Sequence, residues 1–167
     1  MDASLFTLRF TPATMVVAAA VILEPYTVFG MTGHGAHAPY MKMPSRTMVA
    51  LPEHLSFAPG AAIACGTGTA YGALRRVNLS GRDTIAIFGQ GPVGLSATQL
   101  AVAMGARVIA LDISPERLAR ARDFGADATI DPAKDDAVQA IRRLTHGHGA
   151  DLSLHTSSAP SARLAAV

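Results

Sequence analysis

The stretch IFGQGPVG, residues 87–94, decides the fold predicted for this chain. It continues the apolar run TIAIF, residues 84–88, which is typical of a strand buried on both faces of a parallel sheet. The apolar residues that follow recur at steps of three and four from Val93 to Met104, which predicts one buried face of a helix. A glycine-rich turn therefore joins a buried strand directly to a helix. In that context the pattern G-x-G-x-x-G indicates a phosphate-binding turn.

Strand and helix patterns alternate from this turn onward. The spacing predicts further strands at 107–111, 128–130 and 151–155 and further helices at 115–124, 138–144 and 160–167. Ser114 is expected to cap its helix, and Gly105 and Gly125 are expected to end helices in the left-handed conformation. Alternation of this kind predicts an α/β fold with a parallel sheet and right-handed crossovers.

Each glycine of the turn has its own physical role in binding a diphosphate. Gly89 permits the tight turn, Gly91 lets a pyrophosphate approach the backbone, and Gly94 lets the helix pack against the strand. The phosphates would meet free N–H groups at the positive end of the helix. Pro92 fits there because the first turn of a helix does not use its N–H groups.

Asp112 ends the second strand, 18 residues after Gly94. A carboxylate there can accept hydrogen bonds from an adenosine ribose and repels a 2′-phosphate, so the predicted cofactor is NAD rather than NADP. The alternative is a solvated acid at a strand end. Arg117 is expected either near the same ribose or in solvent, and His155 either touches adenosine or packs against the end of the sheet.

The composition excludes several other classes of protein. The chain has 167 residues, 50% hydrophobic and 16% charged, which suits a domain with a buried core and not a disordered chain. The chain has 14 Lys and Arg residues and 12 Asp and Glu residues, and it has no run of basic residues. No nucleic-acid partner is therefore expected. The single cysteine, Cys65, excludes an internal disulfide and an all-cysteine zinc cluster.

No membrane partner is expected either. The longest apolar run, Met15 to Leu23, has nine residues, whereas a bilayer span needs roughly 20. The same run makes a poor signal peptide because Asp2 precedes it and no clear cleavage site follows. The predicted localisation is cytoplasmic.

The segment before the turn is less regular. Residues 1–26 carry no clear period and stay unassigned, and residues 27–43 predict a loop leading into a short strand. Helices are expected at 57–63, with Ser56 as a candidate N-cap, and at 69–77.

The stretch from Pro44 to Val167 resembles the medium-chain dehydrogenase/reductase superfamily, specifically its zinc-type alcohol dehydrogenases. The matching pieces are ACGTGTAYG at 64–72, IFGQGPVG at 87–94, ALDI at 110–113, DFGAD at 123–127 and GHGAD at 147–151. The resemblance implies a Rossmann-like NAD-binding domain with its junction helix over 61–167, holding about four of six strands. It also implies a remnant of a GroES-like catalytic domain over 27–60.

The resemblance further implies hydride transfer between NAD and a small alcohol or carbonyl substrate. Cys65 would be a ligand of the catalytic zinc, which would lower the pKa of the alcohol, and Thr69 would line the nicotinamide end of the pocket. The residues implied for the rest of the cofactor are Gly89, Gly91, Pro92, Val93, Gly94, Asp112 and Arg117. No catalytic residue is assigned, and the family is usually homo-oligomeric.

The chain departs from the family pattern at the metal. It has no second cysteine, and Gly33-His34-Gly35 lacks the glutamate of the family's Gly-His-Glu motif. His34 and His37 with Cys65 are the right ligand types for zinc, but a histidine pair in a glycine-rich loop is expected to be solvated. The sequence therefore predicts an internal piece of a dehydrogenase with weak or no turnover by itself.

Three alternatives stay open. A remnant could bind NAD without catalysis, and a chelator would then leave its affinity unchanged. A zinc-independent quinone reductase of the same superfamily would commonly prefer NADP, which Cys65 and Asp112 disfavour. A methyltransferase also has a glycine-rich loop after its first strand, but it is disfavoured by the block at 64–72.

Overall fold

The computed structural model describes residues 5–9, 16–18, 32–33, 35, 39–45 and 48–166. The chain divides into two compact units, residues 1–65 and 66–167. The elements, in chain order, are β1 (Leu5–Arg9), β2 (Val16–Ala18), β3 (Tyr40–Pro44), β4 (Met48–Ala50), α1 (Phe57–Ala62), the π-helix η2 (Ile63–Thr67), α2 (Gly68–Arg76), β5 (Thr84–Phe88), α3 (Pro92–Ala103), β6 (Arg107–Leu111), α4 (Pro115–Asp123), β7 (Ala128–Ile130), α5 (Ala137–Leu144), β8 (Leu152–His155) and α6 (Pro160–Ala165).

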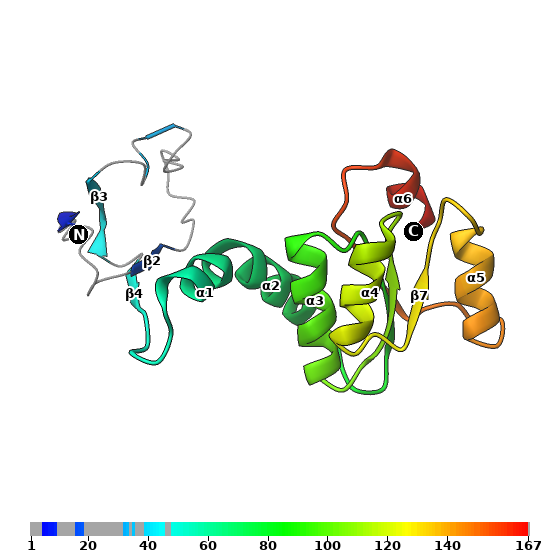
Figure 1. Ribbon diagram of the computed structural model, residues 1–167. Helices are drawn as coiled ribbons and strands as arrows, with labels where there is room; N and C mark the ends of the chain where they lie inside the picture. Colours follow the sequence, from blue (N-terminus) through cyan, green and yellow to red (C-terminus); the bar gives the residue numbers. More distant parts are fainter. Residues whose placement is uncertain are drawn as a thin grey trace. The chain divides into compact units, whose positions relative to one another are not determined.

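The first unit contains two antiparallel strand pairs, β1 with β3 and β2 with β4 (Figure 1). Met41 and Met43 alternate with exposed residues along β3 and are both buried. Ser56 is the N-cap residue of the first helix, α1, as expected, but its side chain makes no capping hydrogen bond. Pro59, at the third helical position, has no N–H and so removes one of the two donors that an N-cap side chain can use.

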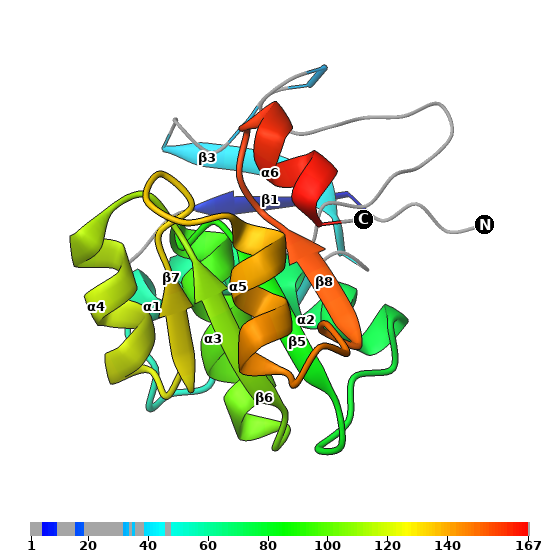
Figure 2. The ribbon, with the colours of Figure 1, turned by 90° about the vertical axis from the view of Figure 1, so that its right-hand side faces the viewer.

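Four parallel strands form the sheet of the second unit, in the order β7-β6-β5-β8 (Figure 2). The register pairs Phe88 of β5 with Leu111 on one side and with His155 on the other. The carboxyl ends of the three strands are therefore level. β8 lies on the other side of β5 from β6, so the strand order reverses beside β5, which is where ligands bind in open α/β sheets.

Helices cover both faces of this sheet. One core cluster joins α2 and α3 to residues of β5 and β6 such as Ile87 and Val108. A second cluster joins Phe88 and Ile109, on the other face, to α5, with residues of α6 packed against it (Figure 2). Burial from both sides explains why β5 and β6 are almost continuously apolar, and it confirms the predicted Rossmann-like α/β fold.

The expected elements of the second unit are present, with small differences at their ends. β8 begins at Leu152 rather than at Asp151, because Asp151 instead exchanges hydrogen bonds with the backbone of Thr84, through its N–H and its carboxylate. The last helix ends at Ala165, and the carbonyl of Ala166 accepts a hydrogen bond from the Ser153 hydroxyl.

The helices expected at 57–63 and 69–77 run over 57–62 and 68–76, and a π-helix fills the interval between them. Gly105 and Gly125 adopt positive φ angles of 86° and 94°, as predicted for helix ends. Among the described residues, no helix has both the length and the apolar character that a membrane span requires.

Candidate nucleotide-binding site

The turn after β5 brings two glycines into direct contact. Gly89 has a φ of +92°, a conformation that residues with a side chain rarely adopt. A Cβ atom on Gly94 would lie 1.8 Å from the carbonyl oxygen of Gly89. The turn can therefore close against the first turn of α3 only because position 94 has no side chain.

Gly91 sits in a different environment within the same turn. A Cβ atom added there would meet nothing within 4 Å, so the backbone faces open space. Gly91 is the N-cap of α3, and Pro92 follows at the start of the helix. The N-terminus of a helix presents unpaired N–H groups and partial positive charge. A diphosphate can approach the chain at this point without displacing a side chain.

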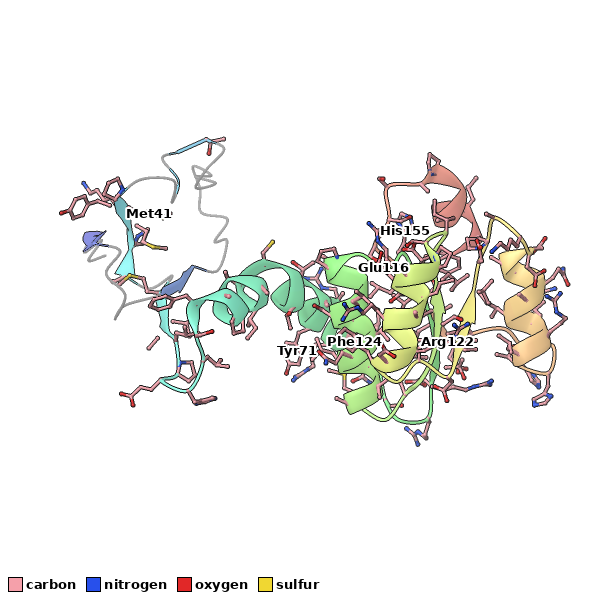
Figure 3. The ribbon with its side chains drawn as sticks, in the orientation of Figure 1. Met41, Tyr71, Glu116, Arg122, Phe124 and His155 are labelled. Carbon is pink, nitrogen blue, oxygen red and sulfur yellow. The ribbon has the colours of Figure 1, made fainter. Side chains whose placement is uncertain are left out.

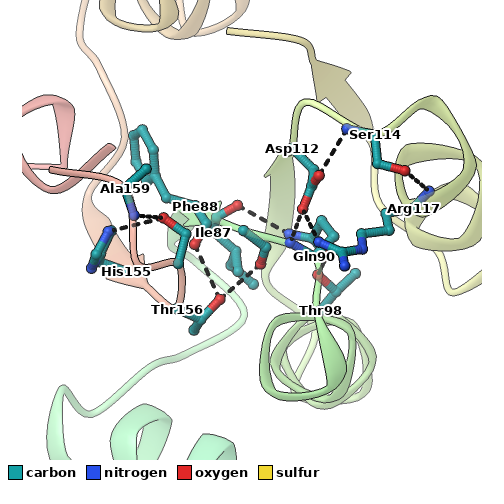
Figure 4. Close-up of polar contacts among 12 residues, drawn as sticks. Ile87, Phe88, Gln90, Thr98, Asp112, Ser114, Arg117, His155, Thr156 and Ala159 are labelled. Carbon is teal, nitrogen blue, oxygen red and sulfur yellow. Dashed lines mark hydrogen bonds and ion pairs between the residues drawn. The ribbon is translucent and has the colours of Figure 1, made fainter. Parts of the chain in front are cut away.

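Asp112, at the end of β6, is buried beside the turn with 6% of its surface exposed. Its Oδ2 accepts the N–H of Gln90 at 2.6 Å, and its Oδ1 accepts the N–H of Ser114 at 2.8 Å (Figure 4). The alternative of a solvated acid is therefore wrong. Each carboxylate oxygen can accept a further hydrogen bond, which leaves capacity for the hydroxyls of a ribose.

Arg117 lies on the first turn of α4, close to Asp112. Its Nη1 is 3.7 Å from the Oδ2 of Asp112, while 57% of the Arg117 side chain is exposed. An ion pair this long and this solvated contributes little to stability. The guanidinium is therefore free to turn toward a bound ligand.

Sequence reasoning missed the residue that holds the turn from inside. Gln90 is fully buried, its Nε2 donates to the carbonyl of Ile87 at 3.0 Å, and its Oε1 accepts the hydroxyl of Thr98 at 2.9 Å. This side chain ties the turn to the strand before it and to the helix after it. No signal in the sequence distinguishes Gln90 and Thr98 from the other polar residues of this segment, such as Ser96.

Thr156, just after β8, holds the turn from the other side. Its hydroxyl is 2.7 Å from the carbonyl oxygen of Gly89 and 3.1 Å from that of Phe88, and its N–H donates to Phe88 (Figure 4). Gly89 is thus fixed between the strands on either side of β5.

A pocket of about 660 Å³ opens at the carboxyl end of the sheet. Its wall includes Gly89, Asp112 and Arg117, so the structure brings these three predicted residues together. Apolar side chains are exposed at the same pocket, with 70% of Ile113 and 76% of Leu164 accessible. The volume lies in the range of small-molecule sites, and the mixture of apolar surface with one buried acid suits a nucleoside.

The other predicted residues of the second unit do not line this pocket. Gly91, Pro92 and Gly94 belong to the turn and to the start of α3, and Val93 packs against the core cluster of α2, α3 and the sheet.

Thr69 is exposed on α2 and lies outside the pocket wall. Cys65 is an exposed thiol in η2 and belongs to the first unit. His34 and His37 lie outside the described residues. Within the part of the chain that the structure describes, no group of three or more His, Cys, Asp or Glu residues could hold a metal ion, so those residues do not fit a catalytic zinc.

The fold and the pocket define the second unit as a Rossmann-like α/β domain. Comparisons with known proteins show which family the chain is similar to. The family model described as zinc-binding dehydrogenase matches residues 92–167. A zinc-type alcohol dehydrogenase-like protein of Escherichia coli K12, YphC, is 40% identical over 146 residues, which is 86% of this chain and 41% of that protein. An alcohol dehydrogenase of Geobacillus stearothermophilus is 36% identical over 118 residues, covering 71% of this chain and 35% of the relative.

Solved structures agree with these relatives. The alcohol dehydrogenase TADH from Thermus sp. ATN1 has a TM-score of 0.77 at 33% identity, over 83% of this chain and 42% of the other. Galactitol-1-phosphate dehydrogenase from Escherichia coli has a TM-score of 0.77 at 31% identity, over 84% of this chain and 41% of the other. These findings show that the chain is similar to part of the zinc-type alcohol dehydrogenases of the medium-chain dehydrogenase/reductase superfamily. It spans about two fifths of the length of the curated relatives it matches.

Proposed function

We propose that residues 66–167 bind NAD and form the cofactor-binding part of an NAD-dependent alcohol dehydrogenase. The observation that carries this proposal is the turn from Gly89 to Gly94, closed against α3 and open at Gly91, with the buried carboxylate of Asp112 beside it. The family supports an oxidoreductase that acts on a small alcohol or carbonyl compound.

The residues present fit a dinucleotide. The N-terminus of α3 would hold the pyrophosphate, and Asp112 would accept the hydroxyls of the adenosine ribose. The exposed apolar surface of Ile113 would pack against the adenine ring. When bound, NAD supplies the nicotinamide that accepts or returns a hydride. The carboxylate of Asp112 would repel a 2′-phosphate and so favour NAD over NADP.

Calorimetric titration of the purified chain tests this proposal. We expect saturable binding of NAD, weaker binding of NADP, and loss of the preference for NAD in Asp112→Ala. A chain that gives no heat with NAD, or an Asp112→Ala variant with an unchanged preference, contradicts the proposal.

A second candidate function is NAD binding without turnover. It is favoured because the described residues do not provide a metal cluster. Measuring NADH formation from an alcohol, with zinc added to the purified chain, separates the two. Weak or no turnover together with NAD binding that a chelator leaves unchanged supports the second candidate, and steady NADH formation rejects it.

A further inference from the structure

A second, smaller pocket lies beside α4, outside the candidate nucleotide-binding site. Its volume is about 250 Å³, and part of its wall comes from Pro115, Leu118 and Arg122 of α4. These residues are three and four positions apart, so they share one face of the helix. None of the wall residues lines the nucleotide pocket, so this pocket is a separate candidate site. The rest of the wall, in β7 and just after it, consists of Thr129, Asp131 and Lys134.

The alternation of side chains along β7 points Thr129 toward this pocket. Ile130 belongs to the core cluster that includes α5, on one face of the sheet. Adjacent residues of a strand point to opposite faces, so Thr129 points to the other face. There its hydroxyl accepts a hydrogen bond from Nη2 of Arg122, and Figure 3 shows Arg122 beside β7. These two side chains are thus held together at the wall of the pocket.

The two cations of the pocket differ in their partners. Nζ of Lys134 is 3.1 Å from Oδ2 of Asp131, so this lysine is paired with the acid of the wall. The side chain of Arg122 instead donates to the neutral hydroxyl of Thr129, and no carboxylate of the described residues forms an ion pair with it. Glu116 lies at the other end of α4 (Figure 3). The pocket therefore has one positive charge that the described residues leave unpaired.

A carboxylate is the ligand group that suits this arrangement. The guanidinium of an arginine presents parallel N–H donors that match the two oxygens of a carboxylate. The hydroxyl of Thr129, which accepts from Arg122, still has its own proton to donate. Asp131 repels a dianion such as phosphate more strongly than a monoanion. Pro115 and Leu118 form the apolar part of the wall, against which a short hydrocarbon chain can pack.

We propose that the pocket between α4 and β7 binds a short aliphatic carboxylate, with its anionic group on Arg122 and Thr129 and its hydrocarbon chain against the apolar residues of α4. This site is distinct from the proposed NAD contacts and does not depend on them. Because the two pockets share no wall residue, both ligands are expected to bind at the same time.

An NMR titration of the isotope-labelled chain with butyrate tests the proposal. We expect saturable shifts of the backbone signals of Arg122, Thr129 and Lys134, with a dissociation constant in the millimolar range for so small a ligand. Butyramide has the same shape without the charge and is expected to bind at least about fivefold more weakly. The same shifts are expected with butyrate when NAD is present in excess.

Variants of the wall residues locate the site. Arg122→Gln is expected to weaken butyrate binding at least about fivefold, because it removes the charge that pairs with the carboxylate. This residue is exposed, so the variant is expected to fold as the wild type does. Thr129→Val keeps the shape of the side chain and is expected to weaken binding about two- to tenfold, as for the loss of one hydrogen bond.

Arg120→Gln is the matched control. Arg120 is an exposed arginine of the same helix, and it does not line the pocket. Its substitution changes the net charge by the same amount as Arg122→Gln. The variant is therefore expected to bind butyrate as the wild type does.

Several results would overturn the proposal. They are the absence of saturable shifts with butyrate, equal binding of butyramide, an equal loss in Arg120→Gln and Arg122→Gln, and shifts that disappear when NAD is added. The last result would place butyrate in the nucleotide pocket and would leave the proposed function intact. A chain that binds butyrate through Arg122 but does not bind NAD supports this proposal and rejects the proposed function.

Discussion

Gly91 and Gly94 are three residues apart, yet Gly91 faces open space and Gly94 is closely packed. Gly94 packs against backbone, and an added methyl group would lie 1.8 Å from the oxygen of Gly89. We expect Gly94→Ala to lower the free energy of unfolding by about 3 kcal/mol or more, because the clash is with backbone that cannot rotate away. Urea unfolding of the purified chain measures this, and a variant as stable as the wild type contradicts the described turn.

Gly91→Ala is the matched variant at the open position. Its methyl group would meet no atom within 4 Å, so we expect a loss of stability of only about 1 kcal/mol, the usual cost of alanine at an N-cap. Binding of NAD is expected to weaken at least about tenfold, because the methyl occupies the path of the pyrophosphate. Calorimetry checks the affinity, and wild-type affinity would show that no phosphate approaches the chain there.

The turn between α2 and β5 is expected to make the stability of the fold depend on pH. The hydroxyl of Ser80 lowers the pKa of Asp83 below its ordinary value of 3.8, and the Ser80 backbone N–H adds to this effect. A lowered pKa in the folded state stabilises the fold above the ordinary value, and this stabilisation is lost as the pH falls through the folded value.

Asp83→Asn tests that contribution. We expect the difference in unfolding free energy between about pH 6 and about pH 3 to be smaller in the variant than in the wild type. Chemical unfolding at the two pH values measures it. Identical differences would mean that the Ser80–Asp83 hydrogen bonds do not depend on the charge of Asp83.

The link between β5 and α3 also depends on a buried polar pair. Thr98→Ala leaves the Oε1 of Gln90 without its 2.9 Å partner, which we expect to cost about 1–3 kcal/mol of unfolding free energy. Combining Gln90→Leu with Thr98→Val removes both polar groups and is expected to recover part of that loss. Thermal and urea unfolding compare the variants, and a double variant less stable than Thr98→Ala would argue against this explanation.

The elements from β5 onward could be predicted because each follows from a local sequence pattern. An apolar run predicts a strand covered on both faces, and Gly105 and Gly125 predict helix ends that need a positive φ. The π-helix from Ile63 to Thr67 could not be predicted, since nothing in its composition distinguishes it from an ordinary helical turn.

The candidate site could be predicted only where it follows a motif. The glycine turn and Asp112 belong to a known spacing. Thr156, in contrast, holds the turn through hydrogen bonds to Phe88 and Gly89 from a segment distant in sequence, and Gln90 acts through a buried side chain. Sequence reasoning treated position 90 as a variable letter of the motif, although its side chain is fully buried. The partners of such residues are defined by the fold, so a pattern along the chain cannot reveal them.

At the scale of the whole molecule, all the proposed NAD contacts lie in one of two compact units. Binding to the folded state alone stabilises the part that binds, by about 2.7 kcal/mol when NAD is at 100 times its Kd. Hydrogen exchange is therefore expected to slow in residues 66–167 on adding NAD and to stay unchanged in peptides from residues 1–65. Equal protection of both units would mean that the bound nucleotide also stabilises the first unit.

The short contact between the N–H of Gln90 and the carboxylate of Asp112, 2.6 Å long, also offers a spectroscopic reporter. An amide proton this close to a carboxylate is strongly deshielded, so its NMR signal is expected well downfield of the main amide envelope. A ribose that shares the same carboxylate draws electron density from it, and the signal then moves upfield during a titration with NAD. One resonance would thus follow the occupancy of the sugar site without any label on the nucleotide.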